Sequence, residues 1–159
     1  MPKHHDPSFV LQVVQPGLAG LMDGSVSTLA PIFAAAFATH SPHVTFVIGM
    51  SAATGAGISM AFAEGLSDDG TLTGRGNPLA RGLIIGIMTF LGGVFHNLPF
   101  LLANLHHALY LAYAVVGLEL LLIAYIRYHF FRMNFFYSSL QVIVGGLLVF
   151  LAGIVIGQS

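Results

Sequence analysis

Three acidic residues, Asp23, Glu64 and Glu119, stand inside long apolar stretches of this sequence. A carboxylate is costly to hold within a membrane, so one found there is by default a functional residue. Carboxylate oxygens suit divalent cations such as Mg²⁺ and Mn²⁺, and an added thioether shifts the preference toward later metals such as Fe²⁺. Met60 lies one helical turn before Glu64 and provides such a sulfur. We therefore predict Asp23, Met60 and Glu64 as ligands of a divalent metal ion.

A stripe of small residues accompanies these side chains. The stretch 49–65 has Gly or Ala at every fourth position, which places these residues on one helix face (Gly49, Ala53, Gly57, Ala61 and Gly65). Such stripes let helices approach closely in lipid. The helix of Asp23 has a similar face that includes Ser27, so we expect the two helices to meet. A two-fold dimer would then gather four carboxylates and two Met60 side chains, and crowded acids bind protons when no metal is present.

Five further side chains are predicted to lie along an ion pathway: Ser27, Glu119, Asp68, Asp69 and His96. Asp68 and Asp69 flank the expected cytoplasmic mouth, where they would concentrate cations. A helix rises about 1.5 Å per residue. Counting residues from the helix ends at this rise places Glu119 in the cytoplasmic half of the membrane and His96 in the outer half.

Each of these assignments has a structural alternative. Asp23 could cap its helix near the interface, and Glu64 could face water as an ordinary helix end. Met60 could fill a gap in the packing. Glu119 could form a hydrogen bond with a Ser, Thr or Tyr side chain, and His96 could be a structural histidine beside a backbone that Pro99 disturbs.

The composition identifies the class of protein. The chain of 159 residues is 56% hydrophobic and 7% charged, whereas soluble domains carry about 25% charged residues. It has no cysteine, which excludes disulfides and thiolate metal sites. It also has no basic cluster, so we expect no nucleic-acid partner. No nucleophile–base arrangement appears, and we expect neither an enzyme nor a permanently bound cofactor.

The hydrophobic pattern predicts an all-α integral membrane protein, because five segments reach the roughly 20 apolar residues that cross a bilayer as a helix. Residues 1–16 are predicted to form a cytoplasmic tail and a short interfacial helix, which Pro16-Gly17 separates from the rest. Residues 17–159 form one transporter domain, and we expect two copies to assemble as a two-fold dimer. The predicted spans are 17–39, 44–66, 79–103, 108–126 and 136–156.

The basic residues predict the orientation, because Lys and Arg favour the cytoplasmic side. With five spans, the N-terminal tail and the second and fourth joints lie on the same side of the membrane. All of the basic residues fall in or beside these regions: Lys3, Arg75, Arg81, Arg127 and Arg132. We therefore expect the N-terminus inside and the C-terminus outside.

Two motifs resemble those of the vacuolar iron transporter family. Residues 23–28 read D-G-S-V-S-T and resemble the D-G-x-V-S-T signature of the family's first helix. Residues 59–67 resemble its second-helix motif, with Ser-Met early and a Glu four residues after the Met. The S-D-D-G and T-G-R-G sequences of the joint 67–78 are similar to those in the membrane half of membrane-bound ferritins.

The resemblance implies a homodimer that exports Fe²⁺, with Mn²⁺ as a second candidate, in exchange for protons and in the service of iron homeostasis. Asp23 and Glu64 match positions that the family uses in transport, and Met60 matches by motif. The short joint 67–78 leaves no room for the Glu-rich extension of the vacuolar members. We expect a bacterial inner membrane, with the lipid bilayer and a ferritin-like protein as candidate partners. A membrane anchor for such a ferritin-like partner, a cation channel and a small organic-cation carrier are the alternatives.

Overall fold

A computed structural model describes residues 6–71 and 73–159 of the chain, and this part is all-helical. Five helical stretches are long and apolar enough to cross a membrane, which confirms the predicted number of spans. The elements are α1 (Pro7–Phe9), the π-helical turn η1 (Val10–Val14), α2 (Gln15–Ser27), α3 (Leu29–Thr39), α4 (Pro42–Gly65), α5 (Pro78–Phe95), the 3₁₀ turn η2 (Leu98–Leu101), α6 (Leu105–Phe131) and α7 (Phe135–Gln158).

The ends of the helices follow from local sequence. Two helices end at residues with a left-handed backbone, His40 after α3 (φ 52°) and Arg132 after α6 (φ 54°). Five helices begin after a polar side chain that accepts a hydrogen bond from a backbone N–H of the first turn, which satisfies donors that have no helical partner. These N-caps are Asp6, Ser41, Asn77, Asn104 and Asn134.

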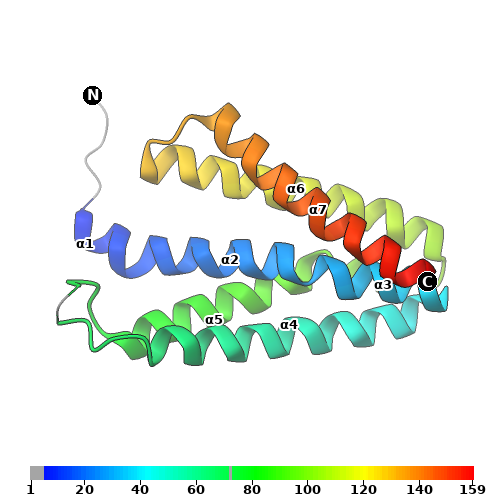
Figure 1. Cartoon of the computed structure of the whole chain (residues 1–159), viewed down its shortest axis with the longest axis horizontal. Coiled ribbons are helices and arrows are strands. Elements are labelled where there is room, and N and C mark those ends of the chain that lie inside the picture. Colours follow the sequence, from blue (N-terminus) through cyan, green and yellow to red (C-terminus); the bar gives the residue numbers. More distant parts are fainter. Residues whose placement is uncertain (1–5, 72) are drawn as a thin grey trace.

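The helices form one bundle with α2 and α3 at its centre. Figure 1 shows α4 and α5 on one side of this central rod, and α6 and α7 on the other. The joints 66–77 and 132–134 lie at the same end of the bundle as the start of α1, whereas the C-terminus lies at the opposite end (Figure 1). The arginines of these joints therefore share one end, as predicted. Lys3 lies outside the described residues, and the side of the membrane that this end faces stays a prediction.

The small residues of α2 and α4 pack on α5, not on each other. A Cβ on Gly24 of α2 would overlap the backbone of Thr89 in α5. A Cβ on Gly86 of α5 would lie 2.7 Å from the carbonyl oxygen of Gly57 in α4. The two small faces therefore do not pack on each other as predicted: contact between α2 and α4 is slight, α5 packs against both helices, and the first span meets the second mainly through α3. Four glycines of α5 make this close packing possible, and none of them was predicted to lie at a helix contact: Gly82, Gly86, Gly92 and Gly93.

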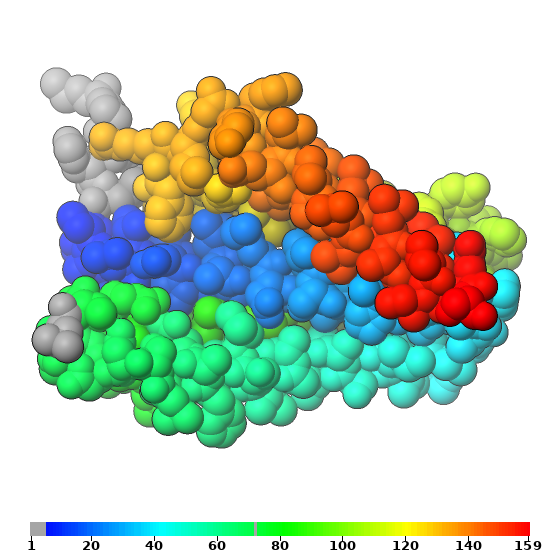
Figure 2. Space-filling model, in the orientation of Figure 1, coloured from blue at the N-terminus to red at the C-terminus, as the bar shows by residue number. Residues whose placement is uncertain are grey.

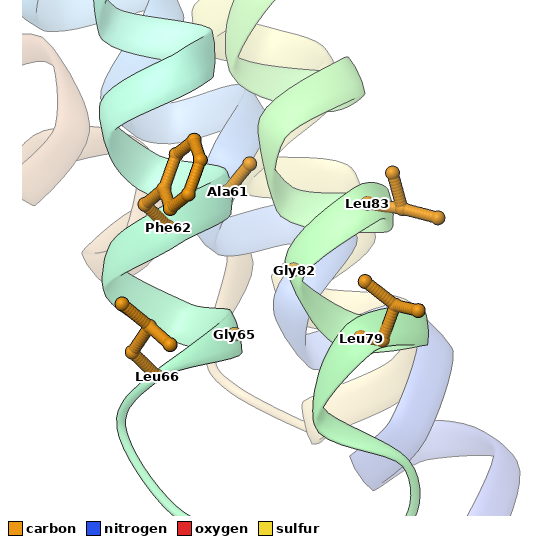
Figure 3. Close-up of a pocket in the computed structure, with 7 residues that line it drawn as sticks. All are labelled: Ala61, Phe62, Gly65, Leu66, Leu79, Gly82 and Leu83. Atoms are coloured by element: carbon orange, nitrogen blue, oxygen red, sulfur yellow. The ribbon is translucent and has the colours of Figure 1, made fainter.

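Figure 3 shows the α4–α5 contact close to the joint between the two helices. Gly65 and Gly82 face each other there, and a Cβ on Gly82 would lie 3.2 Å from the Gly65 backbone. Larger apolar side chains stand around a pocket of about 250 Å³ on the outer side of this contact: Phe62, Leu66, Leu79 and Leu83. The glycines thus bring the two helix ends into direct backbone contact.

The first span differs from its prediction at two places, near Pro16 and near Pro31. Helix does not stop at Pro16-Gly17, because the chain runs helical from Pro7 to Thr39. The wider π turn η1 lies directly before Pro16 and accommodates the residue that cannot donate a backbone hydrogen bond. The helix is interrupted instead at Thr28, between α2 and α3. Pro31 offers no N–H to the carbonyl of Ser27, which weakens the helix at this point.

The third span is not a continuous helix, so the predicted helix over 79–103 is wrong in its last third. α5 ends at Phe95, and the chain continues through a turn and the 3₁₀ helix η2. Pro99 cannot donate within an α-helix, which explains the early end. The Asn97 side chain is fully buried and donates to the carbonyl oxygen of Phe46 at 2.9 Å. Short-range backbone hydrogen bonds replace the α-helical ones in this segment, from Asn97 N–H to Val94, from Phe100 N–H to Asn97 and from Leu102 N–H to Pro99, as non-helical backbone in a membrane requires.

An aromatic cluster holds the two halves of the bundle together at the end that carries the C-terminus. Phe33 of α3 is 1% exposed, and its ring centroid lies 4.8 Å from Phe150 of α7 and 5.4 Å from Tyr113 of α6. Phe100 of η2 meets the same ring at 6.5 Å. Edge-to-face and offset ring pairs of this kind add about 0.5–1.5 kcal/mol each beyond their buried area. The cluster fixes α6 and α7 against the central rod.

Candidate functional site

An open cavity brings together three of the predicted residues, Asp23, Ser27 and Met60. Its volume is about 710 Å³, and its walls come from α2, α4, α6 and α7. Figure 2 shows α2 as a strip at the surface between α4 and the C-terminal helices, which is the side on which these walls stand. Asp23 and Ser27 are one helical turn apart and therefore share a face of α2. The prediction grouped Asp23 and Met60 with Glu64, whereas this cavity holds Ser27 beside them and not Glu64.

Asp23 is the one carboxylate in this cavity, and it is partly buried. It forms no hydrogen bond or ion pair with any other described residue. It does not cap a helix start, because the helical stretch begins at Pro7 and continues past it to Thr39. The capping alternative is therefore wrong. A half-buried carboxylate without a protein partner is available to a cation that enters the cavity.

Two polar residues that the sequence analysis did not place there also line the cavity, Arg127 of α6 and Gln141 of α7. The Arg127 guanidinium donates to the Gln141 side-chain oxygen at 3.0 Å and to the sulfur of Met133 at 3.4 Å. These contacts hold the positive charge at the cavity wall. Arg127 directly follows an apolar run in the sequence. This position predicted the orientation of the chain but not which residues Arg127 would contact.

Glu64 is not among the residues that line the cavity. Its Oε1 atom lies 2.7 Å from Arg75 Nη2 and 2.8 Å from Arg81 Nε. Asp68 joins the same cluster, since its Oδ1 accepts from Arg81 Nη2 at 2.6 Å. The Arg81 side chain is 1% exposed and also donates to the carbonyl oxygen of Gly76 at 3.2 Å. Glu64 is therefore neither a free ligand nor an ordinary solvated helix end.

The joint between α4 and α5 carries the two aspartates predicted at the mouth. The charge-assisted hydrogen bond from Arg81 holds the pKa of Asp68 below its usual value. Asp69 accepts from the backbone N–H and hydroxyl of Thr71 at 2.9 and 2.8 Å, and these bonds lower its pKa. Both carboxylates are thus ionised at neutral pH. Asp69 is exposed to solvent, whereas Asp68 is engaged by the arginines.

A second buried site joins His96 and Glu119 in the middle of the bundle. His96 Nδ1 lies 2.9 Å from Glu119 Oε2, and His96 Nε2 lies 2.9 Å from the Thr28 hydroxyl. The prediction that the acid and the histidine lie in opposite halves of the membrane is therefore wrong. α5 ends at Phe95, before crossing the bundle, and α6 runs on to Phe131, so residue counts from the expected helix ends misjudged both depths. The expectation of a hydrogen-bonded histidine is confirmed.

Within residues 6–71 and 73–159, no group of three or more His, Cys, Asp or Glu side chains is arranged to hold a metal ion. A single chain contributes one carboxylate, one hydroxyl and one thioether to the open cavity. Hard divalent cations take six or more ligands, most of them oxygens. Water or a second chain must therefore complete any metal site here.

Comparison with known proteins gives one match. A family model described as the VIT family matches residues 64–158, which is more than half of the chain. The matched region runs from the end of α4 through α7 and includes Arg81, His96 and Glu119. Searches of curated proteins and of solved structures gave no match.

Proposed function

The chain belongs to the VIT family of membrane metal-ion transporters, and we propose that its cargo is Fe²⁺, with Mn²⁺ as the second candidate, exported from the cytoplasm in exchange for protons. The family membership agrees with the resemblance drawn from the two sequence motifs. The cargo, the proton exchange and the direction are the proposed part. We place the protein in a bacterial inner membrane, where it would lower cytoplasmic iron.

The observation that carries this proposal is the unpaired Asp23 carboxylate in a cavity that also holds the Met60 thioether. A carboxylate without an ion-pair partner in a membrane span is costly and needs a functional reason, and Arg127 at the wall of the same cavity forms no ion pair with Asp23. A passing divalent cation supplies this reason, because the cation neutralises the carboxylate. The soft sulfur of Met60 favours Fe²⁺ over Mg²⁺ and Ca²⁺. The Ser27 hydroxyl adds a neutral oxygen on the same face of α2.

A second copy of the chain completes the proposed site. One copy leaves the metal short of protein ligands, while two copies related by a two-fold axis double every ligand in the cavity. The chain also offers much exposed apolar surface on α4 and α7, which either lipid or a partner protomer must cover: Val47, Ile58 and Phe62 on the first, Leu148, Leu151 and Val155 on the second. The homodimer is thus part of the proposal.

The cluster of Glu64 and Asp68 with Arg75 and Arg81 would act at the mouth of the pathway. A cation that reaches Glu64 must compete with two guanidinium groups for the same oxygen atom. Glu64 therefore binds metal only when at least one arginine moves away. In this proposal Glu64 takes metal during entry, and Asp23 and Met60 bind it inside the membrane. The exposed carboxylate of Asp69 attracts cations to the mouth.

A flux assay tests the proposal. Purified protein is reconstituted in liposomes that contain an Fe²⁺-sensitive dye, and uptake is followed under reducing conditions with and without a pH gradient. Wild type is compared with Asp23→Asn and with Asp6→Asn, a matched loss of one exposed carboxylate outside the cavity and the mouth. We expect gradient-dependent uptake in wild type and Asp6→Asn, and loss of uptake in Asp23→Asn.

Two results would contradict the proposal. If folded, dimeric wild type moves neither Fe²⁺ nor Mn²⁺, the protein is not a transporter of these metals, and the membrane-anchor alternative gains. If Asp23→Asn transports as fast as wild type, the cavity is not the pathway. If the rate of metal uptake is the same with and without the pH gradient, a channel is favoured over proton exchange.

A further inference from the structure

The His96–Glu119 pair is buried far more completely than any interaction in the cavity of Asp23. His96 is 0% exposed and Glu119 is 6% exposed. Glu119 Oε1, its second oxygen, is buried and has no hydrogen-bond partner. The hydroxyl of Ser25 is likewise buried without a partner that meets hydrogen-bond geometry, and it lies close to the same carboxyl group. Unpartnered buried polar atoms are costly, so their retention calls for a functional explanation.

The hydrogen bonds of Thr28 determine where the protons of this pair reside. The Thr28 hydroxyl donates to the carbonyl oxygen of Gly24 at 2.7 Å. We assign the hydroxyl proton to this bond, so that the Thr28 oxygen accepts from His96 and Nε2 carries a proton. One more proton lies between His96 Nδ1 and Glu119 Oε2. Whether it sits on the imidazole or on the carboxyl group, the pair as a whole is then neutral.

Gain or loss of one proton changes the charge of this buried pair. Without the shared proton, the Nδ1 lone pair would face a carboxylate and the pair would carry one negative charge. With a second proton on Glu119, the free oxygen Oε1 would become a donor beside the Ser25 hydroxyl, and the pair would carry one positive charge. Glu119 Oε1, which has no hydrogen-bond partner, is therefore an atom that can bind and release a proton.

The surroundings of the pair leave it electrostatically isolated. Of the elements packed around it, α7 carries no Asp, Glu, His, Lys or Arg. Asp23 stands on the opposite face of α2 from Ser25 and Thr28, because the residues are two and five positions apart on a helix. Arg81 and Glu64 are paired at the far ends of α5 and α4. Among the described residues, His96 is the titratable group in contact with Glu119.

We propose that the His96–Glu119 pair is the proton-binding site of the exchange, separate from the metal cavity and connected to it through α2. One face of α2 carries Asp23 and Ser27 toward the cavity, and the opposite face carries Ser25 and Thr28 toward the pair. Thr28 also marks the interruption between α2 and α3. A change in the charge of the pair therefore alters the Thr28 contact, where the helix is interrupted. A movement of α2 at this position would displace Asp23, which lies five residues earlier on the same helix.

This inference rests on the proposed proton exchange, so its test has a readout that needs no transport. Infrared difference spectra of purified protein are recorded between neutral and higher pH. We expect a carboxyl band that titrates in wild type and disappears in Glu119→Gln: the carboxylic-acid carbonyl band if the shared proton lies on Glu119, or a shifted carboxylate stretch if it lies on His96. Asp6→Asn, at an exposed carboxylate far from the pair in sequence, should keep the band. A spectrum of Glu119→Gln identical to that of wild type would overturn the inference, whatever the transport activity.

Two flux measurements on the same variants then separate coupling from binding. Exchange of Fe²⁺ across liposomes at equal pH needs only the metal cavity, whereas accumulation driven by a pH gradient needs the proton site. We expect Glu119→Gln to keep exchange and to lose gradient-driven accumulation, while Asp6→Asn, which removes an exposed carboxylate at the start of α1, keeps both. Accumulation retained in Glu119→Gln, or exchange lost together with it, would overturn the inference. Absence of gradient-driven accumulation in wild type would instead contradict the proposed proton exchange itself.

A second variant guards against misfolding of Glu119→Gln. Thr28→Val keeps the shape of the side chain but removes the acceptor for His96 Nε2. It leaves both titratable groups in place. We expect a shifted carboxyl band and weakened pH coupling, with metal exchange retained. A band at the wild-type position with full coupling would contradict the role assigned to the Thr28–His96 contact.

Discussion

Replacement of Arg81 by Met should destabilise the protein strongly, because this arginine is the centre of the cluster at the α4–α5 joint. Its side chain is 1% exposed and donates to Glu64, Asp68 and the carbonyl oxygen of Gly76 at 2.8, 2.6 and 3.2 Å. Removal of one member of a buried ion pair costs about 3–5 kcal/mol. The two carboxylates keep 14% and 24% exposure, so water compensates in part. We therefore expect a loss of about 3 kcal/mol in the free energy of unfolding, at the low end of that range.

The measurement is an SDS titration of protein in mixed micelles, followed by circular dichroism because the chain has no tryptophan. Arg132→Met removes an exposed guanidinium and serves as the matched control, with an expected change below about 0.5 kcal/mol. Arg81→Lys keeps the charge but loses the planar fork, so it should fall between the two. A double-mutant cycle with Glu64→Gln should give a coupling energy of about 1.5 kcal/mol.

The outcome decides what Glu64 does. A loss in Arg81→Met no larger than in Arg132→Met, together with zero coupling to Glu64→Gln, would refute the reasoning. Glu64 would then be free of Arg81 in the folded protein, and Arg75 would remain as the arginine that competes with metal for its oxygen. A strong coupling would mean that metal must displace an arginine before Glu64 can bind it.

Three further predictions follow from packing, charge and ligand chemistry. Gly24→Ala should cost about 3 kcal/mol, because its Cβ would overlap the Thr89 backbone, whereas Gly117→Ala meets no atom within 4 Å and should gain up to about 1 kcal/mol; SDS titration compares the two. The lowered pKa of Asp68 adds stability above its ordinary pKa of about 4, and this stability should disappear as the pH falls through the lower folded value. Thermal unfolding from pH 7 to about 2 should therefore show a weaker acid dependence in Asp68→Asn. Met60→Leu should lower Fe²⁺ flux more than Mn²⁺ flux, since it removes the soft ligand, and an unchanged ratio of the two would argue against sulfur coordination.

The number and places of the helices were predictable from the sequence, because about 20 apolar residues are needed for each crossing. The break after Phe95 was not, although Pro99 gave a signal. A proline indicates where a helix loses a backbone hydrogen bond. It does not indicate whether other groups will satisfy the backbone if the helix ends there. Here local 3₁₀-type bonds satisfy the backbone, and the buried Asn97 side chain ties the segment to the Phe46 carbonyl of α4. This second contact depends on the tertiary structure.

The composition of the cavity was partly predictable, and the pairing of charges was not. Asp23 and Ser27 share a helix face by their spacing alone, and the structure adds Met60 to the same cavity. The spacing of small residues does not determine which helix packs against which small face. The position of α5 between α2 and α4 could therefore not be predicted. The partners of Glu64 and Glu119 depend on that position, because Arg81 and His96 both lie on or directly after α5.

The central claim is that the cavity of Asp23 binds a divalent metal ion between two copies of the chain. Binding of Mn²⁺ to purified protein, followed by electron paramagnetic resonance, tests it most directly because Mn²⁺ is paramagnetic and needs no transport to be seen. We predict one tightly bound Mn²⁺ per two chains, lost in Asp23→Asn and kept in Asp6→Asn. Tight binding that survives in Asp23→Asn, or no tight binding in dimeric wild type, would contradict it.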